Sequence, residues 1–355
     1  MSNNSTTVRV GVIGVGIGTS HLKGYSNVKQ AEVIAICDLD ENRARATAKI
    51  FNLDSATIYT DYRAMLENPD IDAISIGLPN FLHQPVAVDA LNAGKHVICE
   101  KPLAMSAEQG QQIADAAARN GKFCMVAQVN RFRGDSKYLK QIISEGQLGD
   151  IYYAHCGVLR RSGIPGYGGW FTTKSKSGGG PLIDLGVHLL DLTWWLAGSP
   201  KPVSVTGVTY AEFGPRKKGV ASLSKPGSSL DGTFDVEDLA VALIRFENGL
   251  TINLEVSWAL HNEKSKMWAN LYGNKGGCSW GDALAIHTDL NHAHVNTSID
   301  VPAGDSWTAE MQHFIDSIIN NTAPDPSADQ GVTMMKMLDA IYKSAETKRE
   351  VIIGM

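Results

Sequence analysis

Residues 8–38 read VRVGVIGVGIGTSHLKGYSNVKQAEVIAICD, and this stretch decides the fold. A β-branched apolar run, residues 8–13, predicts a buried strand that ends at Gly14. Residues 19–26 can open a helix, and the apolar run at 33–37 predicts a second strand that ends at Asp38. A strand, a glycine-rich turn, a helix and a second strand in this order predict one βαβ unit of a parallel sheet.

The glycine turn matches the first two positions of the pattern G-x-G-x-x-G with Gly14 and Gly16, whereas Thr19 occupies the third. Gly14 permits a tight turn, and Gly16 lets a pyrophosphate approach the backbone at the helix N-terminus. Ile17 and Gly18 complete the turn and belong to the predicted cofactor contacts. A purely structural turn is the alternative, because a GxG pair alone is common.

Asp38 is placed to accept hydrogen bonds from an adenosine ribose at the end of the second strand. Residues 39–41 add negative charge and no cation, which disfavours a 2′-phosphate. Arg43 and Arg45 leave that preference open. The sequence therefore predicts dinucleotide binding, with NAD preferred over NADP.

Strands and helices continue to alternate through the first half of the chain. Apolar runs predict strands at residues 73–78, 97–99 and 123–126, and helical patterns occupy residues 84–93 and 106–119. Ser106 and Gln109 fit a capping box at the start of the second helix. The alternation predicts an α/β fold with a parallel sheet covered by helices on both faces.

Beyond about residue 131 the pattern changes to clustered strands. A helix is predicted at residues 136–145, followed by strand-like runs at 151–159, 203–211, 239–246, 250–258 and 267–272. Asn248 and Gly249 give a strong hairpin signal between two of these runs. The second half therefore predicts an α+β domain with a large, mainly antiparallel open sheet. Residues 214–232, rich in Gly, Ser, Lys and Pro, are predicted to be a mobile excursion without an assigned function.

Length and composition limit the class of protein. A chain of 355 residues favours two domains. We expect a dinucleotide-binding domain at 1–130 and a substrate-binding and oligomerisation domain at 131–355, whose last helix, about 328–346, packs back on the first. The net charge of −5 argues against nucleic-acid or anionic-membrane partners. The polar N-terminus, the lack of an apolar run of roughly 18 residues and cysteines without a CxxC pair predict a cytoplasmic protein.

The run HVICEKPLA, residues 96–104, places charged residues at the end of a buried strand. Pro102 stops the strand, so Glu100 and Lys101 lie at its carboxyl end, where open α/β sheets bind ligands. A solvated Glu-Lys pair is the alternative interpretation. Asn80 and His83, which follow the preceding strand, are expected beside the nicotinamide half of a dinucleotide, or act only as loop caps.

The segment SGGGPLIDLGVHLLDLTWWLAG, residues 177–198, predicts a buried helix that begins at Pro181 and is capped by Gly198. Asp184 and His188 are four residues apart and share a face, as a proton-transfer pair would. An Asp-His pair that only steadies the helix is the alternative. Gly186 between them suggests that a cofactor or a neighbouring backbone passes close to the helix.

A loop in the second half carries Arg160, Arg161, Tyr167 and Trp170. Its aromatic rings and donors suit a pyranose ring, whereas adjacent arginines can also signal a carboxylate or phosphate, or a structural pair. His287, His292 and His294 are close in sequence, but without carboxylate or cysteine partners they predict no metal site.

Taken together, VGVIGVGIGTSH, the CD that ends the second strand, LPNFLH, GKHVICEKPLA and GGGPLIDLGVHLLDL resemble the Gfo/Idh/MocA family of oxidoreductases. The resemblance implies an N-terminal Rossmann domain and a C-terminal domain whose open sheet mediates assembly, here into a homodimer or homotetramer. It assigns catalysis to Lys101, Asp184 and His188. It assigns cofactor contacts to Gly14, Gly16, Asp38, Pro79, Asn80, His83, Glu100, Lys101, Gln128 and, less securely aligned, Trp170.

The implied reaction is reversible oxidation of a secondary alcohol on a sugar, sugar derivative or cyclic polyol. His188 is the expected general base, Asp184 orients it or accepts a hydroxyl hydrogen bond, and Lys101 stabilises the developing alkoxide. Substrate contacts are expected from these three residues and from Arg160, Arg161 and Tyr167. Reduction of an imine or keto-sugar on the same fold, and a non-enzymatic dinucleotide-sensing regulator, are the alternatives.

Overall fold

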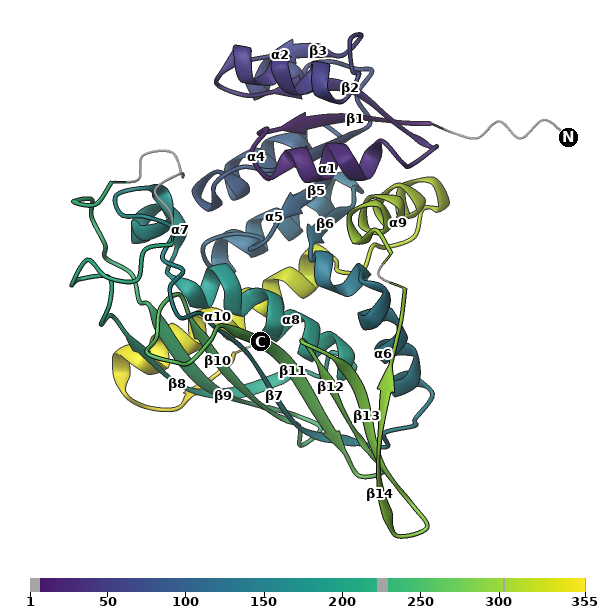
Figure 1. Cartoon of the computed structure of the whole chain (residues 1–355). Coiled ribbons are helices and arrows are strands. Elements are labelled where there is room, and N and C mark those ends of the chain that lie inside the picture. The colour runs from purple at the N-terminus through teal and green to yellow at the C-terminus, as the bar shows by residue number, and fades with distance from the viewer. Residues whose placement is uncertain (1–6, 222–228, 303, 355) are drawn as a thin grey trace, which may run out of the picture. The chain divides into compact units, whose positions relative to one another are not determined.

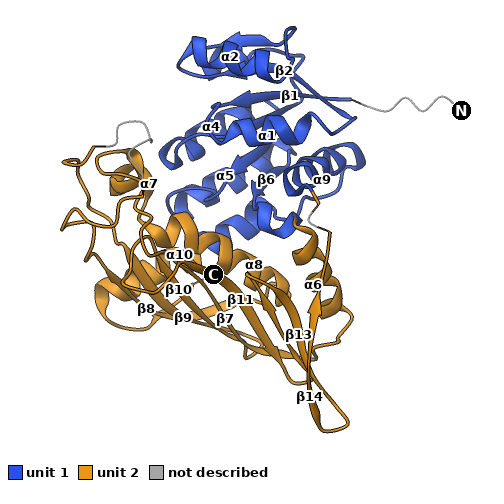
Figure 2. Ribbon diagram, in the orientation of Figure 1, with its two compact units in different colours: residues 1–132, 305–335 blue, residues 133–304, 336–355 orange. Residues whose placement is uncertain are grey.

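The computed structural model describes residues 7–221, 229–302 and 304–354. The chain divides into two compact units, residues 1–132 with 305–335 and residues 133–304 with 336–355 (Figures 1 and 2). The expected boundary near residue 130 lies close to the first of these breaks. Residues 305–335 also belong to the first unit, whereas a return to it was expected only for the last helix, about 328–346.

The first unit contains a six-stranded parallel sheet with the strand order β3-β2-β1-β4-β5-β6. Its strands are β1 (Val8–Ile13), β2 (Ala31–Cys37), β3 (Thr57–Tyr59), β4 (Ala73–Ile76), β5 (His96–Glu100) and β6 (Cys124–Ala127). The central strands are buried almost throughout, which explains their continuous apolar runs. The strand order reverses between β1 and β4, and sheets of this kind bind ligands at the carboxyl ends of the strands there.

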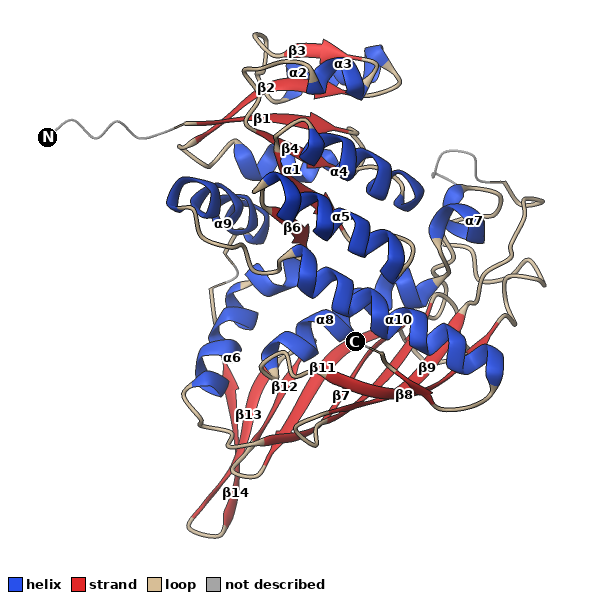
Figure 3. Ribbon diagram, turned by 180° about the vertical axis from the view of Figure 1, so that it is seen from behind, coloured by secondary structure: helices blue, strands red, loops and turns tan. Residues whose placement is uncertain are grey.

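Helices cover both faces of this sheet, as predicted. They are α1 (Gly18–Tyr25), α2 (Glu41–Ile50), α3 (Tyr62–Leu66), α4 (His83–Asn92), α5 (Ala107–Asn120) and α9 (Ser306–Asn320), with short turns η1 (Asn80–Leu82) and η2 (Val129–Phe132). α4 and α5 lie side by side and bury one apolar cluster, while α1, α2 and α9 bury another (Figure 3). The short β3 and α3 were not predicted, because three partly exposed residues give no apolar run.

Two local signals at helix termini illustrate how the sequence sets these elements. Ser106 caps α5 by accepting a hydrogen bond from the amide of Gln109, as the capping box predicts. The Gln109 side chain, however, accepts from the amide of Met105 rather than from that of Ser106. The helix ends where Gly121 adopts a left-handed φ of 59°.

Residues 305–335 belong to the first unit because α9 is amphipathic and packs on α1. Met311, Phe314 and Ile315 are fully buried in the same apolar cluster as Leu22. A Cβ on Gly24 of α1 would lie 2.7 Å from Met311 Cγ, so this helix contact requires glycine. α10 (Ala328–Thr347) begins in the first unit and continues in the second.

The second unit contains a nine-stranded mixed sheet with the order β14-β13-β12-β11-β7-β10-β9-β8-β15. The strands are β7 (Ile151–Leu159), β8 (Pro202–Tyr210), β9 (Leu239–Phe246), β10 (Thr251–Ser257), β11 (Lys266–Gly273), β12 (Gly277–Trp280), β13 (Leu284–Leu290), β14 (Ala293–Ile299) and β15 (Val351–Ile352). All neighbours pair antiparallel except β7 and β10, which confirms the mainly antiparallel sheet.

Helical segments of the second unit are α6 (Gly134–Ser144), η3 (Trp170–Thr172), α7 (Lys174–Ser177), the π-helical turn η4 (Leu182–Gly186) and α8 (Val187–Leu196). The predicted hairpin forms between β9 and β10, where Gly249 has a φ of 87°. β12 to β15 were not predicted. β13 is only partly buried and β14 is largely exposed, and neither shows apolar alternation.

All five cysteines are buried free thiols. Within the described residues, no helix is both long and apolar enough to cross a membrane.

Acidification is expected to destabilise the first unit through His96, the first residue of β5. Its Nδ1 accepts a hydrogen bond from the amide of Phe123 at 3.1 Å, which requires an unprotonated nitrogen. Burial, together with Lys122, lowers the pKa of His96 to about 4. The unfolded chain, with a His pKa of about 6.5, binds the proton more readily, so stability is lost as pH falls from about 6.5 toward 4.

Urea unfolding at several pH values in this range checks this expectation. His96→Asn keeps an acceptor but does not titrate, so its stability should fall less steeply on acidification. Parallel pH profiles for the two proteins would contradict the assignment to His96.

Candidate functional site

The glycine turn after β1 leaves open space at one position only. Gly14 has a φ of 87°, and a Cβ there would lie 2.5 Å from the carbonyl oxygen of Gly77 in the turn after β4. A Cβ on Gly16 would meet no described residue within 4 Å. The N-terminus of α1 that follows has no side-chain cap at Ile17 in the described part of the chain. An uncapped helix N-terminus next to an open glycine fits a phosphate group.

Asp38 at the end of β2 is held in a buried set of hydrogen bonds. Its carboxylate accepts from the amides of Val15 and Asp40, both at 3.0 Å, and from Arg43 Nη2 at 2.6 Å. Burial opposes ionisation, but these donors outweigh it and hold the pKa of Asp38 below its usual value. Of the two arginines that left the preference between NAD and NADP open, Arg43 thus pairs with Asp38, the predicted ribose ligand. Arg45 pairs with Glu41 on α2.

Glu100, the last residue of β5, is buried and not a solvated ion pair. Its Oε1 lies 3.1 Å from His21 Nε2, and its Oε2 accepts from the amide of Lys101 at 3.1 Å. His21 Nδ1 lies 2.5 Å from the hydroxyl of Ser75 on β4. This network orients Glu100 and the backbone of Lys101. Sequence reasoning gave no weight to His21, whose partners are far away along the chain.

His83 was expected among the cofactor contacts, but its ring is fully buried beneath two loops. One ring nitrogen lies 2.7 Å from the carbonyl oxygen of Leu78 and the other 2.7 Å from that of Pro102. Burial lowers the pKa of His83, although both carbonyls favour a protonated ring. His83 therefore joins the loop of Leu78 and Pro79, which leads into the buried Asn80 at the start of η1, to the loop after β5.

Gln128, which follows β6, is buried at 2% exposure. Its side-chain oxygen has no hydrogen-bond partner among the described residues. A buried amide oxygen of this kind suits an N–H donor of a ligand. In the second unit, the Trp170 ring stacks on Phe171 with centroids 3.8 Å apart.

Asp184 and His188 lie in consecutive turns, but the expected single α-helix is interrupted. Asp184 belongs to the π-helical turn η4, and His188 to α8, which ends before Gly198 with its φ of 92°. Trp258 Nε1 donates to Asp184 Oδ2 at 3.0 Å. Trp258 is fully buried at the end of β10 and was missed from sequence.

Gly186 is explained by packing within the second unit. A Cβ there would lie 3.2 Å from Leu182 Cδ1 and 3.3 Å from Val256 Cγ1 of β10. The neighbours that come closest to this glycine are thus side chains, and not the neighbouring backbone that was one of the two expected explanations.

Tyr167, expected at the substrate, is instead fully buried. Its hydroxyl donates to the carbonyl of Lys218 at 2.8 Å, and its ring packs edge-on to Phe234. Arg161 is exposed and donates to the carbonyl of Asn262 at 2.5 Å, while Arg160 is half-buried. The arginine loop is bridged to the 214–232 excursion at Val220 and Ser229, and residues 222–228 lie outside the described residues.

The histidines near the hairpin of β13 and β14 make local contacts. His287 bonds to Ser279 and Asn296, and His294 pairs with Asp289. His292 lies in the turn between the two strands with a φ of 66°. Over residues 7–221, 229–302 and 304–354, no group of three metal-ligating side chains occurs.

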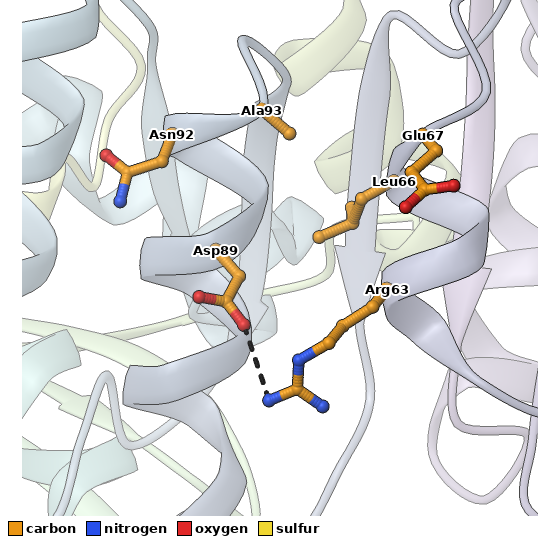
Figure 4. A pocket seen from close by; sticks show the side chains of 6 residues that line it. All are labelled: Arg63, Leu66, Glu67, Asp89, Asn92 and Ala93. Carbon is orange, nitrogen blue, oxygen red and sulfur yellow. Dashed lines mark ion pairs between the residues drawn. The ribbon is translucent and has the colours of Figure 1, made fainter.

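A groove of about 480 Å³ lies between α3 and α4 (Figure 4). Arg63 and Asp89 form an ion pair of 3.7 Å within it. Its other lining residues are Leu66, Glu67, Asn92 and Ala93. Because Asn92 ends α4, the helix that leads into the amino end of β5, the groove lies at the opposite edge of the sheet from Glu100.

The sequence matches a family model described as an oxidoreductase family with an NAD-binding Rossmann fold over residues 8–128. A second model, the C-terminal alpha/beta domain of the oxidoreductase family, matches residues 140–353. D-glucoside 3-dehydrogenase of Escherichia coli is 34% identical over 98% of both chains. Levoglucosan dehydrogenase of Pseudarthrobacter phenanthrenivorans is 27% identical over 95% of this chain and 96% of its own.

Among solved structures, a levoglucosan dehydrogenase in complex with NADH and levoglucosan superposes with a TM-score of 0.86. The match covers 98% of this chain and 100% of that one at 24% identity, which is a likeness of fold.

Proposed function

We propose that this chain, which belongs to the Gfo/Idh/MocA family of oxidoreductases, reversibly oxidises a secondary alcohol of a sugar, sugar derivative or cyclic polyol with NAD. The observation that carries the proposal is the full-length match to D-glucoside 3-dehydrogenase at 34% identity. The similarity to levoglucosan dehydrogenase supports the same substrate class.

The first unit is proposed to hold the coenzyme. The open position at Gly16 and the uncapped α1 suit its pyrophosphate, and Asp38 suits its adenosine ribose. The unpartnered oxygen of Gln128 suits the N–H of the coenzyme's carboxamide. His21 orients the carboxylate of Glu100 for its proposed contact with the coenzyme. The other proposed contacts are Gly14, Ile17, Gly18, Pro79, Asn80 and Lys101 of the first unit and Trp170 of the second. When bound, the oxidised coenzyme accepts a hydride from the carbinol carbon.

The chain itself has to remove the hydroxyl proton and stabilise negative charge on the oxygen. His188 is the proposed base, since an imidazole titrates near neutral pH. Asp184, whose carboxylate is fixed by Trp258, accepts a hydrogen bond from the imidazole or from a neighbouring hydroxyl. Lys101 is proposed to place its ammonium against the developing alkoxide.

The second unit is proposed to carry the substrate and the assembly surface. Arg160 and Arg161 remain the proposed donors to sugar hydroxyls, and the buried Tyr167 serves to anchor their loop. A screen of NAD reduction with inositols, aldoses and glycosides tests the function. Absence of reduction with every alcohol in the screen would contradict it.

NAD is proposed over NADP because Asp38 is ionised and occupies Arg43. Asp38→Ala removes the ribose acceptor and releases Arg43 for a 2′-phosphate. Loss of a hydrogen bond to a charged group costs about 1.5–3 kcal/mol, so KM for NAD should rise by about 10- to 100-fold. KM for NADP should rise much less or fall.

Steady-state kinetics with both coenzymes measures this preference. Glu41→Ala, which removes only the partner of Arg45, is the matched control and should leave both KM values near those of the wild type. Equal losses for NAD and NADP in Asp38→Ala would remove the ribose role.

A homodimer or homotetramer is proposed to form through the open face of the second sheet. Neighbouring strands there present Tyr153 stacked on Tyr272 at 5.6 Å and Trp268 close to Gly157. Val208, also on this sheet, leaves 41% of its surface exposed. Apolar side chains on one sheet face favour burial against a second copy. Solution scattering that gives the mass of a monomer would contradict this assembly.

A cytoplasmic location is proposed from the five buried free thiols, which suit a reducing compartment. Fractionation of cells that express the tagged protein tests the location, and recovery with an oxidising compartment would contradict it.

A further inference from the structure

Glu237 is a buried carboxylate in the second unit that the proposed reaction does not use. It lies just before β9, and its carboxylate accepts three hydrogen bonds. Oε2 accepts from the amide of Gly180 at 2.9 Å, and Oε1 accepts from the amide of Leu182 at 3.1 Å. The hydroxyl of Tyr342 on α10 donates to Oε1 at 3.0 Å.

The triple-glycine run before η4 is shaped by these contacts. A Cβ on Gly180 would lie 2.0 Å from the carbonyl oxygen of Glu237, and a Cβ on Gly179 would lie 1.9 Å from the Tyr342 hydroxyl. Both distances are far below any real Cβ contact. Glu237 and Tyr342 therefore approach the backbone of this run more closely than any side chain there would allow.

The two amides held by Glu237 stand at the start of the segment that carries Asp184. The amide of Asp184 donates to the carbonyl of Gly180 at 3.1 Å. The first turn is therefore bonded to Gly180, the residue whose own amide Glu237 holds. At the other side, Trp258 donates to the Asp184 carboxylate. The amide of Trp258 in turn donates to the carbonyl of Asp238, the residue next to Glu237, at 3.0 Å.

The backbone of this turn is thus held by Glu237, just before β9, and the Asp184 carboxylate is held by Trp258, just after β10. Such fixing matters most for a π-helical turn, because its hydrogen bonds are less favourable than those of an α-helix and such turns are frequent at functional sites. Burial raises the pKa of Glu237, although the two amides and the Tyr342 hydroxyl favour its charged form.

We propose that Glu237 is a positioning residue, which with Tyr342 holds the π-helical turn so that Asp184 and His188 are correctly placed for proton transfer. The proposal rests on the proposed function, since it deepens the role of those two residues. Glu237 does not touch the substrate in this account. It acts through the backbone amides of Gly180 and Leu182.

Glu237→Gln tests the proposal with little change in size. Glutamine offers one acceptor oxygen, so its NH2 group faces at least one of the three donors. We expect kcat for alcohol oxidation to fall by about tenfold or more, because small misplacement of a catalytic group is costly. The dissociation constant of NAD should stay nearly unchanged, because all the proposed coenzyme contacts except Trp170 lie in the first unit. Glu247→Gln, at an exposed turn position, is the matched control and should keep wild-type kcat.

Combination with Asp184→Asn separates positioning from a general loss of stability. If Glu237 acts through Asp184, the double variant should be no slower than Asp184→Asn alone. Multiplying losses, or a kcat for Glu237→Gln within twofold of an active wild type, would overturn the proposal.

A readout that does not need turnover is the indole N–H signal of Trp258 in an NMR spectrum, assigned with Trp258→Phe. It should shift in Glu237→Gln and stay in place in Glu247→Gln, and an unmoved signal in the first would overturn the proposal. If Glu237→Gln does not fold, Tyr342→Phe decides in its place, with an expected loss of kcat and the same shift. A wild type that oxidises no alcohol would instead count against the proposed function. The Trp258 signal would still test whether Glu237 positions the π-helical turn.

Discussion

Alanine at Lys101 or at His188 is expected to lower kcat for alcohol oxidation by about 10²- to 10⁴-fold. A preformed charge against the developing alkoxide and a positioned general base each contribute on that scale. The dissociation constant of NAD should change far less, because the pyrophosphate and ribose contacts lie elsewhere in the first unit. Single-turnover and steady-state rates with the best substrate of the screen give the measurement.

The controls for these two variants are residues of the same type outside the site. Lys49 is exposed on α2, and His294 is exposed on β14, so alanine at either should leave kcat near the wild-type value. A loss of only a few-fold for Lys101→Ala or His188→Ala would contradict the roles assigned to them. The pH profile adds a second criterion, since removal of the base should abolish the ascending limb that it causes.

Valine at Gly16 is expected to abolish most NAD binding while the protein stays folded. The added side chain meets no described residue within 4 Å, so it occupies the space proposed for the pyrophosphate without disturbing the fold. Loss of two charge-assisted hydrogen bonds, at about 1.5–3 kcal/mol each, corresponds to a rise of about 100-fold or more in the dissociation constant. Calorimetry with NAD and thermal unfolding of the free protein measure the two effects.

Gly14→Ala is the comparison variant, and it is expected to reduce stability where Gly16→Val does not. Its Cβ would lie 2.5 Å from the Gly77 carbonyl oxygen at a φ of 87°, so the variant should lose stability even without a ligand. Unchanged NAD affinity in a folded Gly16→Val would contradict the pyrophosphate site proposed at Gly16. A large fall in its melting temperature would show that the open position is needed for the fold.

Local patterns were sufficient for most of the secondary structure. β1, β7 and β9 begin and end at the predicted residues, because apolar periodicity acts within a few positions along the chain. The carboxyl-end location of Glu100 also follows from one strand and one proline. The same reasoning overlooked β13 and β14, whose half-buried and exposed side chains carry no periodic apolar signal.

Candidate residues were predicted by type, but their surroundings were not. His83 was expected at the cofactor from its place after a strand and from the family resemblance, and Tyr167 at the substrate from the aromatic residues of its loop. Both are bonded to backbone carbonyls inside their units. His21 carried no signal, yet it holds Glu100 across 79 residues of sequence.

The sequence by itself determined the βαβ order, the mainly antiparallel second sheet, the family and the identity of the candidate reactive groups. These depend on periodicity, turn chemistry and motifs, which are properties of neighbouring residues. Only the tertiary structure decided which buried groups hold them, such as Glu237 on Gly180 across 57 residues and Trp258 on Asp184 across 74. Such contacts form because a buried polar group must find a partner wherever the fold brings one, and that place is set by the packing of the whole sheet rather than by spacing along the chain.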